Sequence, residues 1–169
     1  IIYIFTCILI IDSIGSFAIW KYTKNPLFLK ASIAWGANFI NFAIHGAAQN
    51  HAQLTLIGHA FYFITACCLS SILCDVIGER LPAKKYIGIG FLNLAASLSA
   101  FQIFQNYMLS ALILDLFIAF PMIYYSYKTF AKKDSPIMAK AFGVLLAING
   151  LHFLDYPFLH NDPIGRVVG

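Results

Sequence analysis

The side chains with the greatest capacity for chemistry are five histidines and a few acids, set in a chain that is 60% hydrophobic. Histidine titrates near neutral pH and can bind metal or haem. In the stretch NGLHFLDYPFLHND, the spacing of Asn149, His152, Asp155 and Tyr156 places all four on one face of a helix. These four residues are therefore candidates for binding a small ligand.

Pro157 predicts where this helix ends. A proline lacks a backbone donor and restricts the residue before it, so we expect the helix to end near Leu154. Asp155 would then lie at a helix C-terminus, where the helix dipole disfavours a negative charge. It needs a partner, and His152 is the nearest candidate. The pair is either a polar latch at the end of the bundle or part of a ligand site, and both interpretations stay open.

Two acids and two further histidines lie within or beside apolar runs. Ionisable groups inside a membrane-spanning segment are costly and usually face the interior of the bundle. Asp115 and Asp12 could each contact a ligand, carry a proton or form half of a polar pair, and a hydrogen-bonded structural carboxyl is the alternative. His45 and His59 join Asp115 as candidate ligand-binding residues, and with His152 they could converge from three helices. The chain has no HExxH or CxxC motif that would support a metal site. Whether a metal binds at these histidines therefore stays open.

The elements that carry these residues are long apolar runs. Only 11% of the residues are charged, against about 25% in soluble domains. Runs of about 20 apolar residues are the length that spans a bilayer. We therefore predict an all-α fold, a polytopic membrane bundle of six transmembrane helices in contact with lipid. The predicted spans are 1–20, 29–48, 54–75, 86–105, 107–127 and 137–155, with a tight turn at Gln105 and Asn106.

The basic residues predict how the bundle is oriented. All of the 11 lysines and arginines except Arg166 lie in or beside the first, third and fifth links between predicted spans. Because basic residues are retained on the cytoplasmic side, the N-terminus should face outward, and all five histidines should lie in the outer half. The net charge of +4 is explained by this topology, so no nucleic-acid partner is expected.

The two ends of the sequence suggest a longer protein. The chain begins with Ile1 inside an apolar run, and its last residues, GRVVG, resemble the start of another span. We expect residues 1–169 to be a membrane-embedded fragment of a seven-helix domain. A seventh span would return the chain to the cytoplasm, where an output domain outside this chain would follow.

One stretch resembles a known family. LHFLDYPFLH followed by PIGRVVG is similar to the last-helix motif of multi-spanning N-terminal sensor domains in bacterial histidine kinases and diguanylate cyclases, with the pattern L-H-x-L-D-Y-P-x-L. The earlier stretch KYTKNPLFLKASIAWGANFI resembles that family's link into its second helix, with Leu29 and Trp35 in place. His160 stands where the family pattern has arginine. The matching positions of the motif are Leu151, His152, Leu154, Asp155, Tyr156, Pro157 and Leu159.

The resemblance implies a transmembrane receptor in the bacterial inner membrane. It would bind a small ligand or sense a membrane signal from the outer side and relay it to the cytoplasmic output domain of a two-component or cyclase protein. The full-length protein would be a homodimer, and this fragment itself would not be an enzyme. The resemblance names no ligand or cofactor. Two alternatives stay open: an integral membrane redox or metal- or haem-binding enzyme that uses the histidines, and a small transporter built around Asp115 and Asp12.

Overall fold

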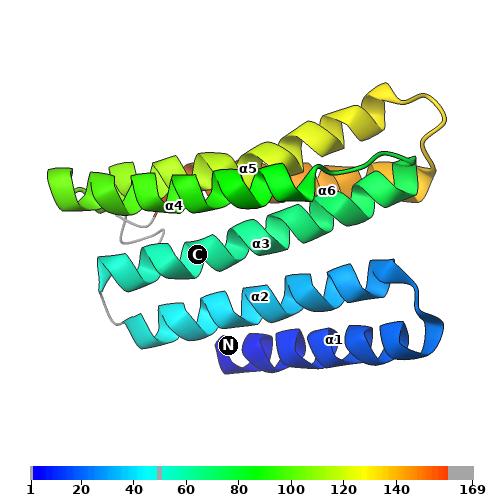
Figure 1. The fold of residues 1–169 in the computed structure, drawn as a ribbon, viewed down its shortest axis with the longest axis horizontal. Helices are drawn as coiled ribbons and strands as arrows, with labels where there is room; N and C mark the ends of the chain where they lie inside the picture. The colour runs from blue at the N-terminus through cyan, green and yellow to red at the C-terminus, as the bar shows by residue number, and fades with distance from the viewer. Residues whose placement is uncertain (1, 49–50, 160–169) are drawn as a thin grey trace.

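The structure is a computed structural model that describes residues 2–48 and 51–159 (Figure 1). The described residues form six helices, so the predicted all-α class is confirmed. The helices are α1 (Ile2–Thr23), α2 (Pro26–Ala48), α3 (Ala52–Ile77), α4 (Ala83–Phe104), α5 (Tyr107–Ala131) and α6 (Ile137–Leu159).

The helices run up and down beside one another and are joined by short links (Figure 1). Helix α3 lies at the centre, because it contacts α2, α4, α5 and α6, whereas α1 packs on α2. Helix α4 packs chiefly on α5 and less extensively on α3. As a result, α3 and α5 are the two helices from which an interior site can be built.

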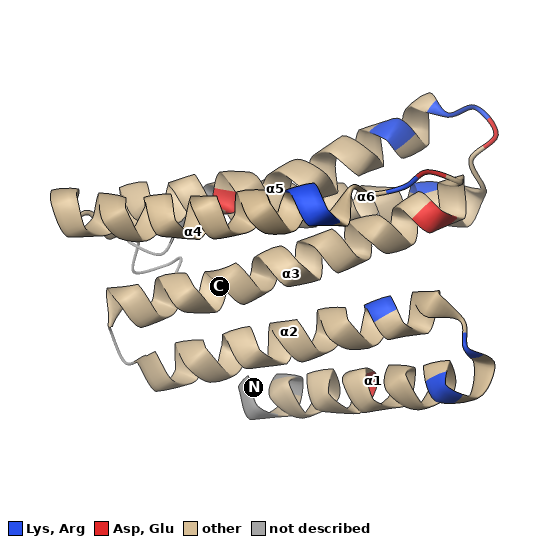
Figure 2. Cartoon of the chain, in the orientation of Figure 1, with Lys and Arg blue, Asp and Glu red and all other residues tan. Residues whose placement is uncertain are grey.

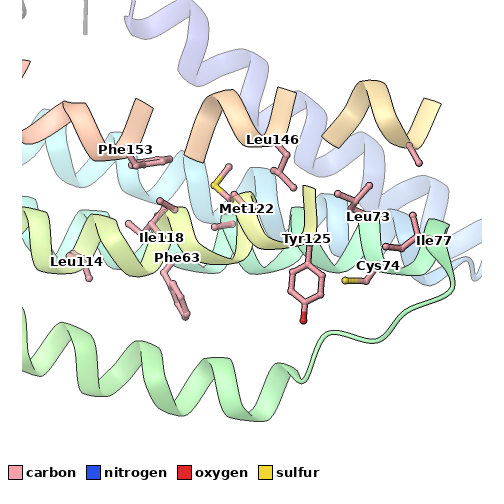
Figure 3. Close-up of a cluster of buried hydrophobic side chains, with 13 residues drawn as sticks. Phe63, Leu73, Cys74, Ile77, Leu114, Ile118, Met122, Tyr125, Leu146 and Phe153 are labelled. Atoms are coloured by element: carbon pink, nitrogen blue, oxygen red, sulfur yellow. The ribbon is translucent and has the colours of Figure 1, made fainter. Parts of the chain in front are cut away.

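A buried apolar cluster lies between α3, α5 and α6. Figure 3 shows its side chains, which include Phe63 and Leu73 from α3, Leu114 and Ile118 from α5, and Phe153 from α6. Large apolar side chains are also exposed on the outer faces of the bundle. Such surfaces suit helices surrounded by lipid, which is as apolar as the core.

Five of the described helices are long and apolar enough to cross a membrane. They are α2, α3, α4, α5 and the segment Ile137–Leu154 of α6. The chain is therefore a multi-spanning helical bundle, and of the six predicted spans these five meet the criterion of length and composition. The described lysines and arginines lie in the right-hand half of Figure 2, which holds the α1–α2, α3–α4 and α5–α6 links. We call the end with these links the lysine-rich end and the opposite end the lysine-poor end.

The predicted turn between the fourth and fifth spans is confirmed. Gln105 ends α4 in the left-handed conformation, with φ of 50°, and its amide donates to the Phe101 carbonyl. Asn106 then caps α5, because its side-chain oxygen accepts from the Leu109 amide at 3.1 Å. These two residues reverse the chain at the lysine-poor end.

The predicted end of the last helix is wrong. Helix α6 continues through Pro157 to Leu159 rather than ending near Leu154. Pro157 lies in the last turn, where its missing donor leaves only the Phe153 carbonyl without its usual helical partner. A proline is therefore tolerated more easily here than in the middle of a helix.

Candidate functional site

The centre of the candidate site is a buried hydrogen bond between α3 and α5. His59 Nδ1 lies 3.1 Å from Asp115 Oδ1, and the two side chains are only 2% and 0% exposed. Either the imidazole or the carboxyl carries the shared proton. The pair links two helices at residues 56 positions apart in the sequence.

A second imidazole from α2 covers this pair. The rings of His45 and His59 are stacked, with centroids 5.0 Å apart and an angle of 16° between their planes. Gly58 makes this approach possible, because a Cβ there would lie 2.8 Å from His45 Cδ2 and 3.2 Å from Asn41 Oδ1. The bare backbone of one glycine therefore lets α2 bring its polar side chains against the turn of α3 that carries His59.

Helix α4 adds further polar groups beside α5. The amide of Asn93 donates to the Leu114 carbonyl at 3.4 Å, and the hydroxyl of Ser97 donates to the Ser110 carbonyl at 2.7 Å. Both side chains are buried. We call the whole set the polar layer, and its residues are Asn41, His45, His59, Asn93, Ser97, Ser110 and Asp115.

The polar layer lies inside the apolar thickness of the bundle. Asp115 is eight residues from the start of α5, and His59 is seven residues from the start of α3. At a rise of about 1.5 Å per residue, they lie roughly 10–12 Å from the lysine-poor end. Water does not readily replace a lost hydrogen bond at such a depth, so the polar atoms need partners within the protein or a bound species.

Three acceptors in the polar layer are not satisfied. Among the described residues, none hydrogen-bonds to Asp115 Oδ2, Asn41 Oδ1 or Asn93 Oδ1, although all three atoms are buried. An unsatisfied buried acceptor costs about 1–3 kcal/mol. These three oxygens are therefore available to accept further hydrogen bonds.

The structure separates the predicted site residues into two groups. Asp115, His45 and His59 come together in the polar layer, a grouping that the sequence did not predict. Asn149 and His152 lie on α6 with exposed side chains, and the neighbouring Phe153 is the one that turns into the core. Asp12 is likewise exposed, on α1.

The predicted pairing of His152 with Asp155 involves a side chain, that of Asp155, which lies outside the described residues. The side chains of Asp155 and Tyr156 lie outside the described residues, as does all of His160. The latch and the ligand-contact interpretations of this stretch therefore both stay predictions.

Sequence reasoning missed the contribution of α4 and the role of Gly58. Asn93 and Ser97 were visible only as polar residues in an apolar run, a signal that serine and asparagine often give when they merely stabilise helix packing. Asn41, buried at 2% exposure, was visible in the same way.

Two ion pairs lie at the lysine-rich end. Lys30 contacts Asp75 at 2.5 Å, and Lys128 contacts Glu79 at 2.7 Å. The ammonium of Lys132 donates to the Ile77 carbonyl at the end of α3. These contacts tie the ends of α2 and α5 to the end of α3, so the polar layer and the lysine-rich end are connected through α3.

No grouping suited to a metal occurs in the part of the chain that the structure describes: it has no set of three His, Cys, Asp or Glu side chains placed to hold an ion. Of the three histidines that could converge from three helices, His45 and His59 stack on each other and His152 is exposed on α6, so a convergence of all three stays a prediction.

Comparisons with protein-family models, curated proteins and solved structures found no match to this chain. The resemblance to bacterial sensor domains therefore rests on its sequence motif alone.

Proposed function

We propose that this chain is the membrane sensor domain of a bacterial signalling protein, with the polar layer as the element that receives the signal. The observation that carries the proposal is the buried His59–Asp115 hydrogen bond, covered by His45 at membrane depth. Ionisable groups in such places are expensive to maintain and usually serve a function. The motif around Leu151 to Leu159 adds the family resemblance.

The proposed mechanism is a shift between two packings of the bundle. A small donor or a proton that reached Asp115 Oδ2 would weaken or strengthen the bond to His59, and with it the contact between α3 and α5. A ligand shifts such an equilibrium only by binding the two packings with different affinity. Helix α5 packs extensively on α6, which would carry the change towards a cytoplasmic histidine kinase or diguanylate cyclase domain.

The proposed orientation and membrane location rest on the distribution of basic residues among the links and on the family resemblance. Basic links on the cytoplasmic side would place the N-terminus and the polar layer towards the outside, so that the signal enters from the outer face of the inner membrane. The full-length receptor would act as a homodimer.

The test uses the full-length gene product in membranes. Asp115→Asn and His59→Gln should each change the basal output, measured as autophosphorylation or cyclic dinucleotide synthesis. Coupling of about 0.5–2 kcal/mol corresponds to a change of roughly twofold to thirtyfold. Asp12→Asn is the matched control, because Asp12 is exposed on α1 and should leave the output unchanged. Correctly inserted variants with wild-type output, or a gene that encodes no output domain, would refute the proposal.

A small proton-coupled transporter is the second candidate, favoured by the fully buried carboxyl of Asp115 and its unsatisfied Oδ2. This alternative predicts pH-dependent uptake into proteoliposomes that is lost in Asp115→Asn. Uptake that does not depend on pH or on this residue would eliminate it.

A further inference from the structure

A cavity of about 740 Å³ lies between α3 and α4, with contributions from α2 and α5. Its walls are almost entirely apolar, and Phe61, Ile64 and Phe91 are among the larger side chains that form them. A volume of this size is typical of small-molecule sites, which usually carry a few polar groups at fixed positions. The polar layer is not part of this lining, so the cavity is a separate feature.

The cavity is an elongated groove that runs along α3. Its α3 lining extends from Ile57 to Ser71, and its α4 lining extends from Ala83 to Leu94. The fourteen steps from residue 57 to residue 71 correspond to a length of about 21 Å along a helix. One leaflet of the hydrocarbon core is about 15 Å thick. The groove is therefore long enough for an acyl chain.

The groove is polar at one end only. Lys30 and Ser71 lie in its lining near the lysine-rich end, where the α4 lining begins at Ala83. Lys84 and Lys85 follow Ala83 directly and are exposed. Figure 2 shows the basic residues of α2 and α4 in the same half of the bundle. A lysine beside an apolar groove at this level can extend its ammonium towards lipid headgroups.

Asp75 does not cancel this positive charge. It contacts Lys30 at 2.5 Å, but the pair is partly exposed, with the two side chains 27% and 38% accessible. An ammonium has three donors, so Lys30 can bind a second acceptor while it keeps Asp75. Lys84 and Lys85 are two further exposed lysines at the start of α4, directly after the lining residue Ala83, and Glu79 is paired with Lys128.

We propose that this groove binds one anionic phospholipid, with an acyl chain along α3 and the phosphate at Lys30. Basic pockets between membrane helices are suited to anionic headgroups, and here the charge lies at the end where a headgroup would be. The inner end of the groove reaches Leu114, the residue before Asp115. Phe63 lines the groove and also belongs to the buried cluster. Lipid occupancy is thus placed to influence the packing of α3 against α5, whatever signal the polar layer receives.

The experiment places the full chain in phosphatidylcholine vesicles that contain a trace of phosphatidylglycerol with a photoreactive acyl chain. After illumination, labelled residues are identified by mass spectrometry. Labelling is expected on the groove-facing residues Ile64, Cys67 and Phe91, and unlabelled phosphatidylglycerol should compete at least fivefold better than unlabelled phosphatidylcholine.

Two variants test the two halves of the site. Ala60→Phe fills the groove and should remove most of the labelling, whereas Ala141→Phe, at an exposed position on α6 outside the groove, should not. Lys30→Gln should reduce the preference for phosphatidylglycerol about fivefold, as expected for the loss of one lysine near a lipid surface. Lys128→Gln is its control, because it removes another partly exposed lysine from an ion pair but does not line the groove.

Equal competition by the two lipids would overturn the proposal, because it would show only the ordinary lipid that surrounds any membrane protein. So would unchanged labelling in Ala60→Phe. If that variant fails to fold, the Lys30→Gln variant decides, because an unchanged lipid preference there is equally incompatible with a phosphate at Lys30.

Discussion

Gly58 and His59 are neighbours in α3 and have complementary roles. Gly58 provides the space into which Asn41 and His45 fit, and His59 provides the hydrogen bond to Asp115. Among lipid-facing helices, small residues permit close approach, and polar groups then form bonds across the contact. The site thus depends on the lack of a side chain at Gly58 as much as on the ionisable groups of His59 and Asp115.

Gly58→Ala should destabilise the protein by about 1–3 kcal/mol, the usual cost of forcing extra atoms into a packed interior. The added methyl would lie 2.8 Å from the His45 ring, so the ring must move away from His59. The free energy of unfolding in micelles measures the effect.

Gly88→Ala is the matched control, because a Cβ there would meet nothing within 4 Å. The glycine penalty within a helix predicts a gain of about 0.5–1 kcal/mol for that change. Equal effects of the two substitutions would contradict the close α2–α3 contact at Gly58.

At the scale of the elements, the turn between α4 and α5 is defined by two residues. Gln105 adopts the left-handed conformation and Asn106 caps the next helix. This cap matters for the site, because α5 carries both Ser110 and Asp115 within its first three turns. A frayed start of α5 would displace the side of the polar layer that α5 provides.

Asn106→Ala should lower the free energy of unfolding by about 1 kcal/mol, the typical cost of losing an N-cap. Asn149→Ala removes an exposed asparagine whose amide only reaches the Leu145 carbonyl at 3.4 Å, so it should change stability by less than about 0.5 kcal/mol. Thermal unfolding of the two purified variants distinguishes these outcomes, and an Asn106→Ala variant as stable as Asn149→Ala would show that the cap is not needed.

At the scale of the whole molecule, charge and polarity are separated along the bundle. The described lysines and arginines lie in the half that holds the lysine-rich end, and the polar layer lies towards the other end (Figure 2). Between the two, α3 and α5 run through the interior and carry both the polar pair and most of the apolar cluster. Helices α3 and α5 thus connect the two ends through a packed interior.

Reporter fusions should reveal the orientation of the bundle. A reporter active only in the cytoplasm should be active when fused after Asp134, in the α5–α6 link, and inactive when fused after Asn106, in the α4–α5 link. The physical reason is the retention of basic links on the cytoplasmic side. A reporter active only outside should give the reverse pattern, and the opposite result from both reporters would invert the proposed topology.

Some features could be predicted because they depend on residues close together in the sequence. The apolar runs, the turn at Gln105 and Asn106, and the presence of Asp115 within a span all belong to this class. Pro157 shows a limit of local reasoning, because a proline in the last turn of α6 did not end the helix.

The sequence by itself predicted an all-α bundle of long apolar helices, where its links lie, and that Asp115 lies within one of these helices, but Asp12, predicted in the same way, is exposed. Only the tertiary structure decided that Asp115 bonds to His59, that His45 stacks on that ring, and that a groove runs between parts of α3 and α4. Helices in lipid are apolar on all sides, so no amphipathic pattern identifies the face that turns inward. Which side chains meet depends on the rotation and approach of the helices, and at this site a single glycine sets that approach.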